Sequence, residues 1–364
     1  MELNKHNNKM TIYFDVKELY YLPQFLPIFY ELEKFKNIDV QFIFYENSFD
    51  EIKAKFISEK KLPHKWVKSQ KEAAKYYVNQ KPSWIIFGNN FPYLDKIHFK
   101  SKTAQLGHGI GPKIAYYDQS KTPTTVRFVE SEYRLNRLKK MYPGERFINV
   151  GFCKLDTLFD NKINNIELKD LNLNESKKTV LYAPTFYPSS IENFSLQFPN
   201  DLSNFNIIIK PHYFSLSKKK YQNHRNILDH WKSFENVYLA KSYDFSIIPF
   251  LKLSDIMISD TSSAMLEFAA LHKPVIWCTF LKLRWNYKGI FSFRFKNRMD
   301  QDIKEYENFT IQANSYHEMK GKINKLNVDK FKLNQNSKKH IEKFLGPLDG
   351  NASKRIVNFL IENG

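Results

Sequence analysis

Hydroxyl and carboxylate side chains gather in one short turn of this chain, between two apolar runs. The segment Asp260-Thr261-Ser262-Ser263 follows the apolar residues 256–258 and precedes apolar positions at helical spacing over 265–270. This order predicts a strand, a turn and a helix, with another strand at 274–277. A turn at the carboxyl end of a parallel strand exposes backbone N–H groups and the positive end of a helix. Thr261, Ser262 and Ser263 would add hydroxyl donors for a phosphate.

Glu267 lies four residues after Ser263, on the same face of the expected helix. Its carboxylate could accept hydrogen bonds from the hydroxyls of a ribose. A purely structural role fits the pattern about as well, because Asp260 and the serines could simply cap the helix.

A histidine between glycines follows another predicted strand. His108 lies in segment 107–113, directly after the apolar run 103–106. Glycines let the backbone approach a ligand closely, and an imidazole titrates near neutral pH, so His108 could take the proton of an acceptor hydroxyl. The alternative is a histidine that is hydrogen-bonded in a tight turn. Lys113 could bind a phosphate or be an ordinary solvated lysine.

Two further strands are each ended by a proline. Pro211 stops the run at 206–209 and directs His212, while Pro184 stops the run at 179–183 and is followed by Thr185. An imidazolium at His212 could hydrogen-bond a phosphate and stabilise charge on a leaving group, with Lys210 and Thr185 as further phosphate ligands. The alternative for His212 is a capping or core histidine.

Composition narrows the class of protein. The chain has 364 residues, 42% of them hydrophobic, which suits a globular fold with two domains. A formal net charge of +18 attracts anions: nucleic acid, an anionic membrane leaflet or phosphorylated substrates. Nucleic acid is the weakest of these, because the sequence has no zinc-finger spacing, no aromatic RNA-binding signature and no long basic helix.

Other features of the sequence argue against several classes. It contains no run of about 18 apolar residues, and its first residues are polar, so we expect a cytoplasmic protein without a secretory signal. Cys153 and Cys278 are read as buried thiols. No metal-binding or dinucleotide motif is present, so we expect a metal-independent mechanism without a cofactor.

Short apolar runs alternate with helical segments, which predicts an α/β fold with parallel sheets. The expected strands are 11–14, 40–44, 84–87, 103–106, 125–129 and 147–150 and, after a polar stretch at 160–178, 179–183, 206–209, 237–239, 256–258 and 274–277. We therefore expect two facing Rossmann-like domains, at 1–165 and 166–336, with a central cleft as the site. A helical tail at 337–364 is expected to pack back on the first domain.

An ordered set of motifs resembles the CDP-glycerol glycerophosphotransferases that prime and polymerise teichoic acids and related capsules. The matching segments are 107–113 (similar to His-Gly-x-x-x-Lys), 151–158 (Gly-x-x-Arg-x-Asp-x-Leu), 181–186 (Leu-Tyr-Ala-Pro-Thr), 210–212 (a basic His-Pro segment), 260–267 (Asp-Tyr-Ser-Ser-x-x-x-Asp) and 348–356 (a terminal Asp-Gly segment). The sequence departs from the family pattern at Lys154, Thr261 and the Pro-His order at 211–212.

The resemblance implies a GT-B architecture, with a CDP-linked polyol donor in the C-terminal domain and a glycan or lipid-linked acceptor near the N-terminal one. The implied reaction transfers glycerol phosphate, or a related polyol phosphate, and releases CMP. His108 would be the base; His212, Lys113, Thr185, Lys210 and the 260–263 turn would hold the phosphates, and Glu267 the ribose. Peripheral attachment at the inner face of the membrane would bring enzyme and acceptor together.

Two other functions remain open at this stage. One is a GT-B glycosyltransferase that uses a CMP-sugar, such as sialic acid or Kdo, or another nucleotide sugar. The acidic base motif that bacterial sialyltransferases carry in their first domain is not found here. The other is a non-catalytic protein that binds a nucleotide or an anionic lipid.

Overall fold

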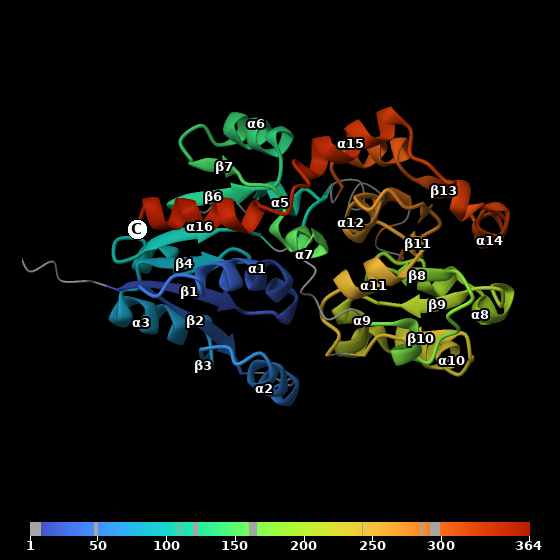
Figure 1. The fold of residues 1–364 in the computed structure, drawn as a ribbon, viewed down its shortest axis with the longest axis horizontal. Coiled ribbons are helices and arrows are strands. Elements are labelled where there is room, and N and C mark those ends of the chain that lie inside the picture. The colour runs from blue at the N-terminus through green and yellow to red at the C-terminus, as the bar shows by residue number, and fades with distance from the viewer. Residues whose placement is uncertain are drawn as a thin grey trace, which may run out of the picture. The chain divides into compact units, whose positions relative to one another are not determined.

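The computed structural model describes residues 9–46, 50–107, 109–111, 113–118, 123–159, 166–241, 243–284, 287, 289–291 and 299–364. The chain divides into two compact units, each built on its own sheet (Figure 1). Unit 1 consists of residues 1–108, 117–157 and 349–364, and unit 2 of residues 109–116 and 158–348.

Unit 1 holds a seven-stranded sheet with the order β3-β2-β1-β4-β5-β6-β7, in which all the described strand pairs are parallel. The strands are β1 (Met10–Val16), β2 (Ile38–Tyr45), β3 (His64–Val67), β4 (Trp84–Phe87), β5 (Lys102–Gln105), β6 (Val126–Val129) and β7 (Phe147–Asn149). Its helices are α1 (Leu22–Leu32), α2 (Asp50–Glu59), α3 (Gln70–Gln80), α4 (Leu94–Ile97), α6 (Glu132–Met141) and α16 (Ala352–Glu362); α5 (Ala115–Asp118) and α7 (Asp156–Phe159) occur where the chain passes between the units.

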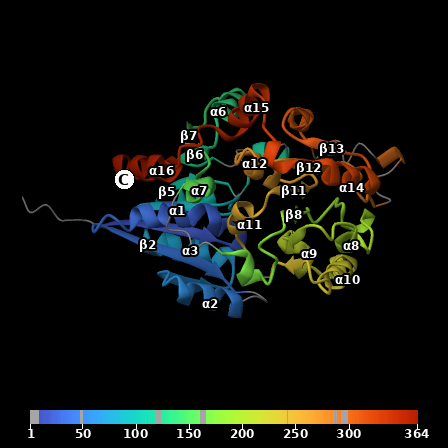
Figure 2. The ribbon, with the colours of Figure 1, turned by 45° about the vertical axis from the view of Figure 1, so that its right-hand side comes forward.

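Successive side chains of β1 point to opposite faces of the first sheet, and each face is covered. Phe14 packs on Phe25 of α1, with ring centroids 5.1 Å apart. On the other face, Tyr13 packs with Tyr77 of α3 in one apolar cluster. The C-terminal helix α16 contacts α1 and lies on the same side of the sheet (Figures 1 and 2). Burial on both faces explains why these strands are continuous apolar runs rather than alternating ones.

Unit 2 holds a six-stranded parallel sheet with the order β10-β9-β8-β11-β12-β13. Its strands are β8 (Thr179–Ala183), β9 (Asn206–Ile209), β10 (Val237–Leu239), β11 (Ile256–Ser259), β12 (Val275–Cys278) and β13 (Ile311–Ala313). Its helices are α8 (Phe198–Asp201), α9 (Tyr213–Ser217), α10 (Gln222–Trp231), α11 (Ile248–Leu253), α12 (Ala264–Ala269), α14 (Tyr316–Lys325) and α15 (Gln335–Leu345). One face of the sheet packs on Phe198, Leu228 and Trp231.

Both sheets have the strand order 3-2-1-4-5-6 of a doubly wound nucleotide-binding fold, extended by one strand in unit 1. The expected α/β class with parallel sheets is therefore confirmed. Strand β13 was not predicted from the sequence. Within the tail, α15 contacts α12 of unit 2, and the chain returns to unit 1 at Asp349. The boundaries at 165/166 and 336/337 and the central cleft stay predictions.

Candidate active site at the carboxyl edge of the second sheet

The order of the second sheet reverses between β8 and β11, and doubly wound folds bind ligands outside the carboxyl ends of two such strands. β8 ends at Ala183 and β11 at Ser259, which are register partners. The Ser259 hydroxyl also donates to the carbonyl of Ala183 at 2.6 Å. The predicted segments Pro184-Thr185 and Asp260–Ser263 therefore leave the sheet side by side.

Asp260 is completely buried and faces the loop that follows β8. One carboxylate oxygen accepts the Thr185 backbone N–H at 2.7 Å. The other accepts the Ser190 N–H at 3.0 Å and the Ser190 hydroxyl at 3.1 Å, and the Ser189 hydroxyl donates to it at 3.4 Å. Burial raises the pKa of Asp260, while the bonds from Thr185 and Ser190 oppose that rise. The carboxylate thus ties loop 185–190 to the end of β11.

Thr185 is 5% exposed, and its hydroxyl donates to the Pro188 carbonyl at 2.7 Å. Thr261 is also buried, and Glu267 on α12 is only 1% exposed. In this structure these side chains, like that of Asp260, lie inside the protein rather than at its surface. Their predicted roles in binding phosphate and ribose are untested and stay predictions.

His212 ends the segment after β9 and caps α9. Its Nδ1 accepts the Phe214 backbone N–H at 3.1 Å, so Nδ1 carries no proton and the neutral ring holds its proton on Nε2. The ring packs on Phe186, with centroids 4.6 Å apart. The sequence analysis predicted an imidazolium at His212. In that form Nδ1 carries a proton, so it could no longer accept the Phe214 N–H. The neutral ring carries its N–H at Nε2 and lies against Phe186 of the loop that Asp260 holds. Lys210, two residues earlier, is half-buried.

The two serines of the turn are partly exposed. The hydroxyl of Ser262 accepts the N–H of Ala264, the first residue of α12, at 3.2 Å. Ser263 lies against the glycine segment: a Cβ built on Gly109 would be 3.7 Å from its Oγ and 2.7 Å from the Tyr116 hydroxyl. At Gly111 (φ +123°) a Cβ would be 3.0 Å from the Tyr306 hydroxyl. The positive φ at Gly111 favours glycine, whereas a side chain at Gly109 would have to displace the end of the Tyr116 side chain.

His108 lies outside the described residues, so its predicted role as a base is neither supported nor opposed. Lys113, at the end of the same segment, is partly exposed and forms an isolated antiparallel bridge with Met299. The described glycines Gly109 and Gly111 nevertheless lie close to Ser263 of the 260–263 turn.

Several residues at this edge were missed from the sequence. Phe186 supports His212, and Ser189 and Ser190 bind Asp260. The Arg284 guanidinium lies 4.3 Å from the centroid of the Tyr187 ring and is exposed. It belongs to no motif, so the sequence carries no signal for it. It adds a permanent cation next to loop 185–190.

Two predicted motifs meet elsewhere, in unit 1. Asp156, from segment 151–158, accepts the Ser353 N–H and hydroxyl, both at 2.6 Å, and the Ala352 N–H at 3.2 Å. Burial raises the pKa of Asp156, and the bonds from Ser353 and Ala352 oppose the rise. Arg355, also on α16, donates to the Val150 carbonyl at 3.0 Å. These motif residues attach the C-terminal helix to unit 1.

Within the described part of the chain, His, Cys, Asp and Glu side chains form no group of three or more that could hold a metal ion. The helices described there also include none that is long and apolar enough to cross a membrane.

Two doubly wound parallel sheets with a polar cluster at a switch point define a GT-B type α/β protein. The chain belongs to the CDP-Glycerol:Poly(glycerophosphate) glycerophosphotransferase family, whose sequence profile matches residues 1–362. The resemblance seen in the motifs and the expected GT-B class are thereby confirmed.

Two curated relatives are teichoic acid glycerol-phosphate primases. That of Bacillus spizizenii is 30% identical over 161 residues, which cover 42% of this chain and 39% of the relative. That of Bacillus subtilis is 23% identical over 255 residues, which cover 63% of this chain and 60% of the relative. The matches thus span less than two thirds of these relatives' own lengths.

Solved structures support the fold. The wall teichoic acid polymerase TagF superposes with a TM-score of 0.67 at 15% identity, covering 98% of this chain and 90% of that one. The UDP-GlcNAc 2-epimerase from Neisseria meningitidis gives 0.60 at 16% identity, covering 97% of this chain and 100% of that one. At such identities the likeness concerns the fold alone.

Proposed function

We propose that this protein transfers glycerol phosphate, or a related polyol phosphate, from a CDP-linked donor to a hydroxyl of a glycan or lipid-linked acceptor and releases CMP. Membership of the glycerophosphotransferase family supports the reaction class. Relatives named as primase and polymerase of teichoic acid support a cell-envelope acceptor, and TagF was solved after a soak with CDPG.

The reaction has a simple balance. The acceptor oxygen attacks the phosphorus that bears the polyol, and the bond from that phosphorus to the bridging oxygen breaks. CMP leaves with the bridging oxygen, and a base takes the proton of the acceptor hydroxyl. Such a transfer depends mainly on positioning and on stabilising the negative charge of the phosphates.

The observation that carries the proposal is the convergence of donors at the carboxyl edge of the second sheet. This edge carries the His212 ring with its N–H at Nε2, the partly exposed Ser262 and Ser263, and the permanent cation of Arg284. A cation together with several N–H and O–H groups favours an anionic ligand. We assign the diphosphate of the donor to this edge, with Lys113, Thr185, Lys210 and Thr261 as further ligands and Asp260 as the residue that holds loop 185–190. The ribose is assigned to Glu267.

His108 is proposed as the base, because it lies in the glycine segment whose described residues, Gly109 and Gly111, adjoin Ser263. We also propose peripheral association with the inner face of the cell membrane. The formal charge of +18 supports attraction to an anionic leaflet.

A donor panel tests this function. CMP release is measured with CDP-glycerol, CDP-ribitol, CMP-sialic acid, CMP-Kdo and UDP-sugars, with and without EDTA, in the presence of an acceptor extract. We expect turnover of a CDP-polyol that persists in EDTA, with radiolabelled polyol phosphate incorporated into acceptor.

Turnover confined to a CMP-sugar or a UDP-sugar would overturn the phosphotransferase proposal and leave the fold unchanged. CMP binding without consumption of any donor would favour a non-catalytic nucleotide-binding protein instead. Loss of CDP-polyol turnover in EDTA would contradict the metal-independent mechanism alone.

A further inference from the structure

A second candidate site lies wholly within unit 1. A pocket of ≈ 730 Å³ opens beside α4 and the loop that follows β4. Its lining residue Asn90 follows the carboxyl end of β4, whereas His98 and Phe99 lie just before β5 begins at Lys102. Nothing in the proposed transfer chemistry uses this pocket. Its lining residues are Gln70, Asn90, Phe91, Pro92, Leu94, Asp95, His98, Phe99 and Pro123.

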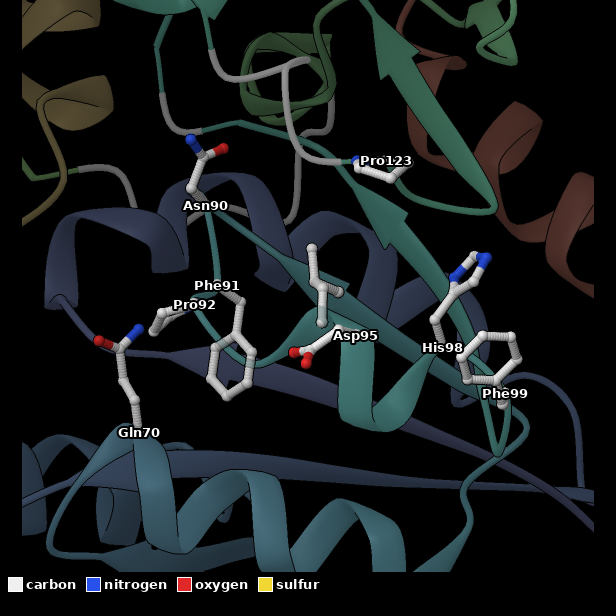
Figure 3. A pocket seen from close by; sticks show the side chains of 9 residues that line it. Gln70, Asn90, Phe91, Pro92, Asp95, His98, Phe99 and Pro123 are labelled. Carbon is white, nitrogen blue, oxygen red and sulfur yellow. The ribbon is translucent and has the colours of Figure 1, made fainter.

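The apolar lining of the pocket includes one buried aromatic residue, Phe91, and one highly exposed aromatic residue, Phe99. Phe91 is buried and packs on Phe87 and Tyr77, at centroid distances of 4.9 and 5.9 Å. Phe99 is 87% exposed, more than any other large hydrophobic side chain in the described part of the chain. Figure 3 shows Asp95 between Phe91 and the neighbouring pair His98 and Phe99. A flat ligand could therefore rest on an aromatic ring while its edge reaches a carboxylate.

Buried residues orient the polar side chains of the lining. The side-chain amide of Gln105, a residue that is 2% exposed, donates to Oδ1 of Asn90 at 3.2 Å. This bond fixes the orientation of the Asn90 amide, with its oxygen toward Gln105 and its nitrogen on the other side. His98 Nδ1 lies 3.3 Å from the hydroxyl of the buried Thr103. These bonds fix an amide and an imidazole at the pocket before any ligand binds, which lowers the entropic cost of binding.

The charge of the pocket selects the kind of ligand. Although the chain carries a formal charge of +18, the described residues that line the pocket include no lysine or arginine, and their only carboxylate is Asp95. A phosphate would be repelled by that carboxylate, and a cation beside the lining, Lys17, already donates from Nζ to Oε1 of Gln70 at 3.1 Å. A neutral molecule with an apolar face and several hydroxyls avoids this penalty.

We propose that this pocket binds a neutral carbohydrate, in the form of a pyranose ring. The C–H face of the sugar packs on Phe99, and its hydroxyls donate to Asp95 and exchange hydrogen bonds with the Asn90 and Gln70 amides. This combination of an aromatic face with a few oriented polar groups is typical of small-molecule sites. The inference goes beyond the proposed transfer reaction and does not depend on it.

Saturation-transfer NMR on the full chain tests the site with D-glucose, D-galactose, N-acetyl-D-glucosamine and N,N′-diacetylchitobiose as probes. At least one probe should bind with a millimolar dissociation constant. Phe99→Ala and Asp95→Ala should each weaken that binding by about tenfold, since stacking and paired hydrogen bonds each contribute on the order of 1 kcal/mol. Phe35→Ala, an exposed aromatic of unit 1 that does not line the pocket, should leave binding unchanged.

Both pocket side chains are exposed, so the variants should keep the melting temperature of the parent chain, and a melt confirms this. The inference is overturned if no probe binds at tens of millimolar, or if neither variant weakens binding. Displacement of the sugar by CMP or glycerol 3-phosphate in the pocket would also overturn it. Turnover of a CDP-polyol is measured in parallel. Sugar binding can be observed without any donor, and transfer can occur in a protein that binds no free sugar, so either proposal can fail while the other holds.

Discussion

The carboxylate of Asp260 accepts the backbone N–H of Thr185 at 2.7 Å, across the carboxyl ends of two neighbouring strands. A similar bond closes the opposite end of the same strand pair: Asp255 accepts the Thr179 N–H at 2.8 Å. The two aspartates therefore form a matched pair, one at the proposed active edge and one away from it.

Asp260→Ala should lower both stability and turnover. Removing the carboxylate leaves the buried N–H groups of Thr185 and Ser190 without an acceptor, at a cost of about 2–4 kcal/mol. Because loop 185–190 carries Phe186, which supports His212, turnover should fall by at least about tenfold. Asp255→Ala should lower the melting temperature with little effect on turnover of the folded fraction. Equal turnover losses in the two variants would contradict a positioning role for Asp260.

His212 has two separate roles: Nδ1 accepts the Phe214 N–H, and the Nε2–H is proposed to bind phosphate. Two substitutions can distinguish these roles. His212→Asn keeps a side-chain acceptor for the Phe214 N–H but removes the Nε2–H donor. Stability should be nearly unchanged while CMP release falls by about 10²-fold, the usual loss for a charge-stabilising donor. His212→Ala should lose the cap as well and cost about 1 kcal/mol more. Full activity in the asparagine variant would remove His212 from phosphate binding.

His108→Ala should reduce turnover by about 10²-fold or more, as expected for loss of a general base. Donor binding, measured as the dissociation constant of CDP-glycerol, should change little, because the base acts on the acceptor hydroxyl. Near-normal turnover in the folded variant would exclude His108 as the base. Exposed His230→Ala is a suitable control.

Asp15 gives unit 1 a dependence on pH. Its carboxylate accepts the hydroxyls of Tyr45 and Tyr77 at 2.6 and 2.7 Å and is 4% exposed. Burial raises the pKa of Asp15 to about 6, although both tyrosine bonds and the charge of Lys17 oppose the rise. The folded chain then holds a proton that the unfolded chain releases near pH 4, so stability falls as the pH rises through this window.

The size of this effect is about 3 kcal/mol between about pH 4 and pH 6, because each pKa unit corresponds to about 1.4 kcal/mol. Urea denaturation of the parent chain and Asp15→Asn across this range measures it. The asparagine keeps an acceptor for the tyrosines but does not titrate, so the difference between the two curves should change by that amount. Parallel curves would show that folding does not raise the pKa of Asp15.

Asp156→Ala should loosen the C-terminal helix without touching the chemistry of transfer. It removes the acceptor of the Ser353 and Ala352 N–H groups at the start of α16, at a cost of about 1–2 kcal/mol. Hydrogen exchange in α16 should accelerate. Asp349→Ala, which breaks a more exposed pair with Arg355, should have a smaller effect. Unchanged exchange in both variants would mean that other contacts hold the helix.

Local patterns were sufficient for most of the fold. Strands β4, β8, β9 and β10 occupy the residues that their apolar runs predict, because burial on both faces leaves a continuous apolar signal. β13 was missed because its three residues, Ile-Gln-Ala, do not form an apolar run, whereas the equally short edge strand β10 reads Val-Tyr-Leu.

The positions of the candidate site residues at the ends of strands could be predicted from the sequence, but the contacts between these residues could not. Strand-end motifs correctly put Thr185 and the turn at 260–263 on one edge of a sheet. That Asp260 turns inward to Thr185 is a contact between residues 75 positions apart, which no local spacing encodes. The same holds for Arg284 beside Tyr187. Segment 151–158 entered only as one of the motifs of the family resemblance, and its Asp156 contacts the C-terminal helix.

The return of the chain to unit 1 has a consequence for synthesis on the ribosome. Between the end of the central part of unit 1 at Thr157 and its last segment at Asp349, about 190 residues of unit 2 are made. At 5–20 residues per second this takes roughly 10–40 s. Until then Trp84 lacks Leu360, whose carbonyl accepts its indole N–H at 3.1 Å, and Phe359, which packs on its ring. Unit 1 is thus begun before unit 2 and completed after it, so the part of its sheet around Trp84 stays uncovered while unit 2 is being made.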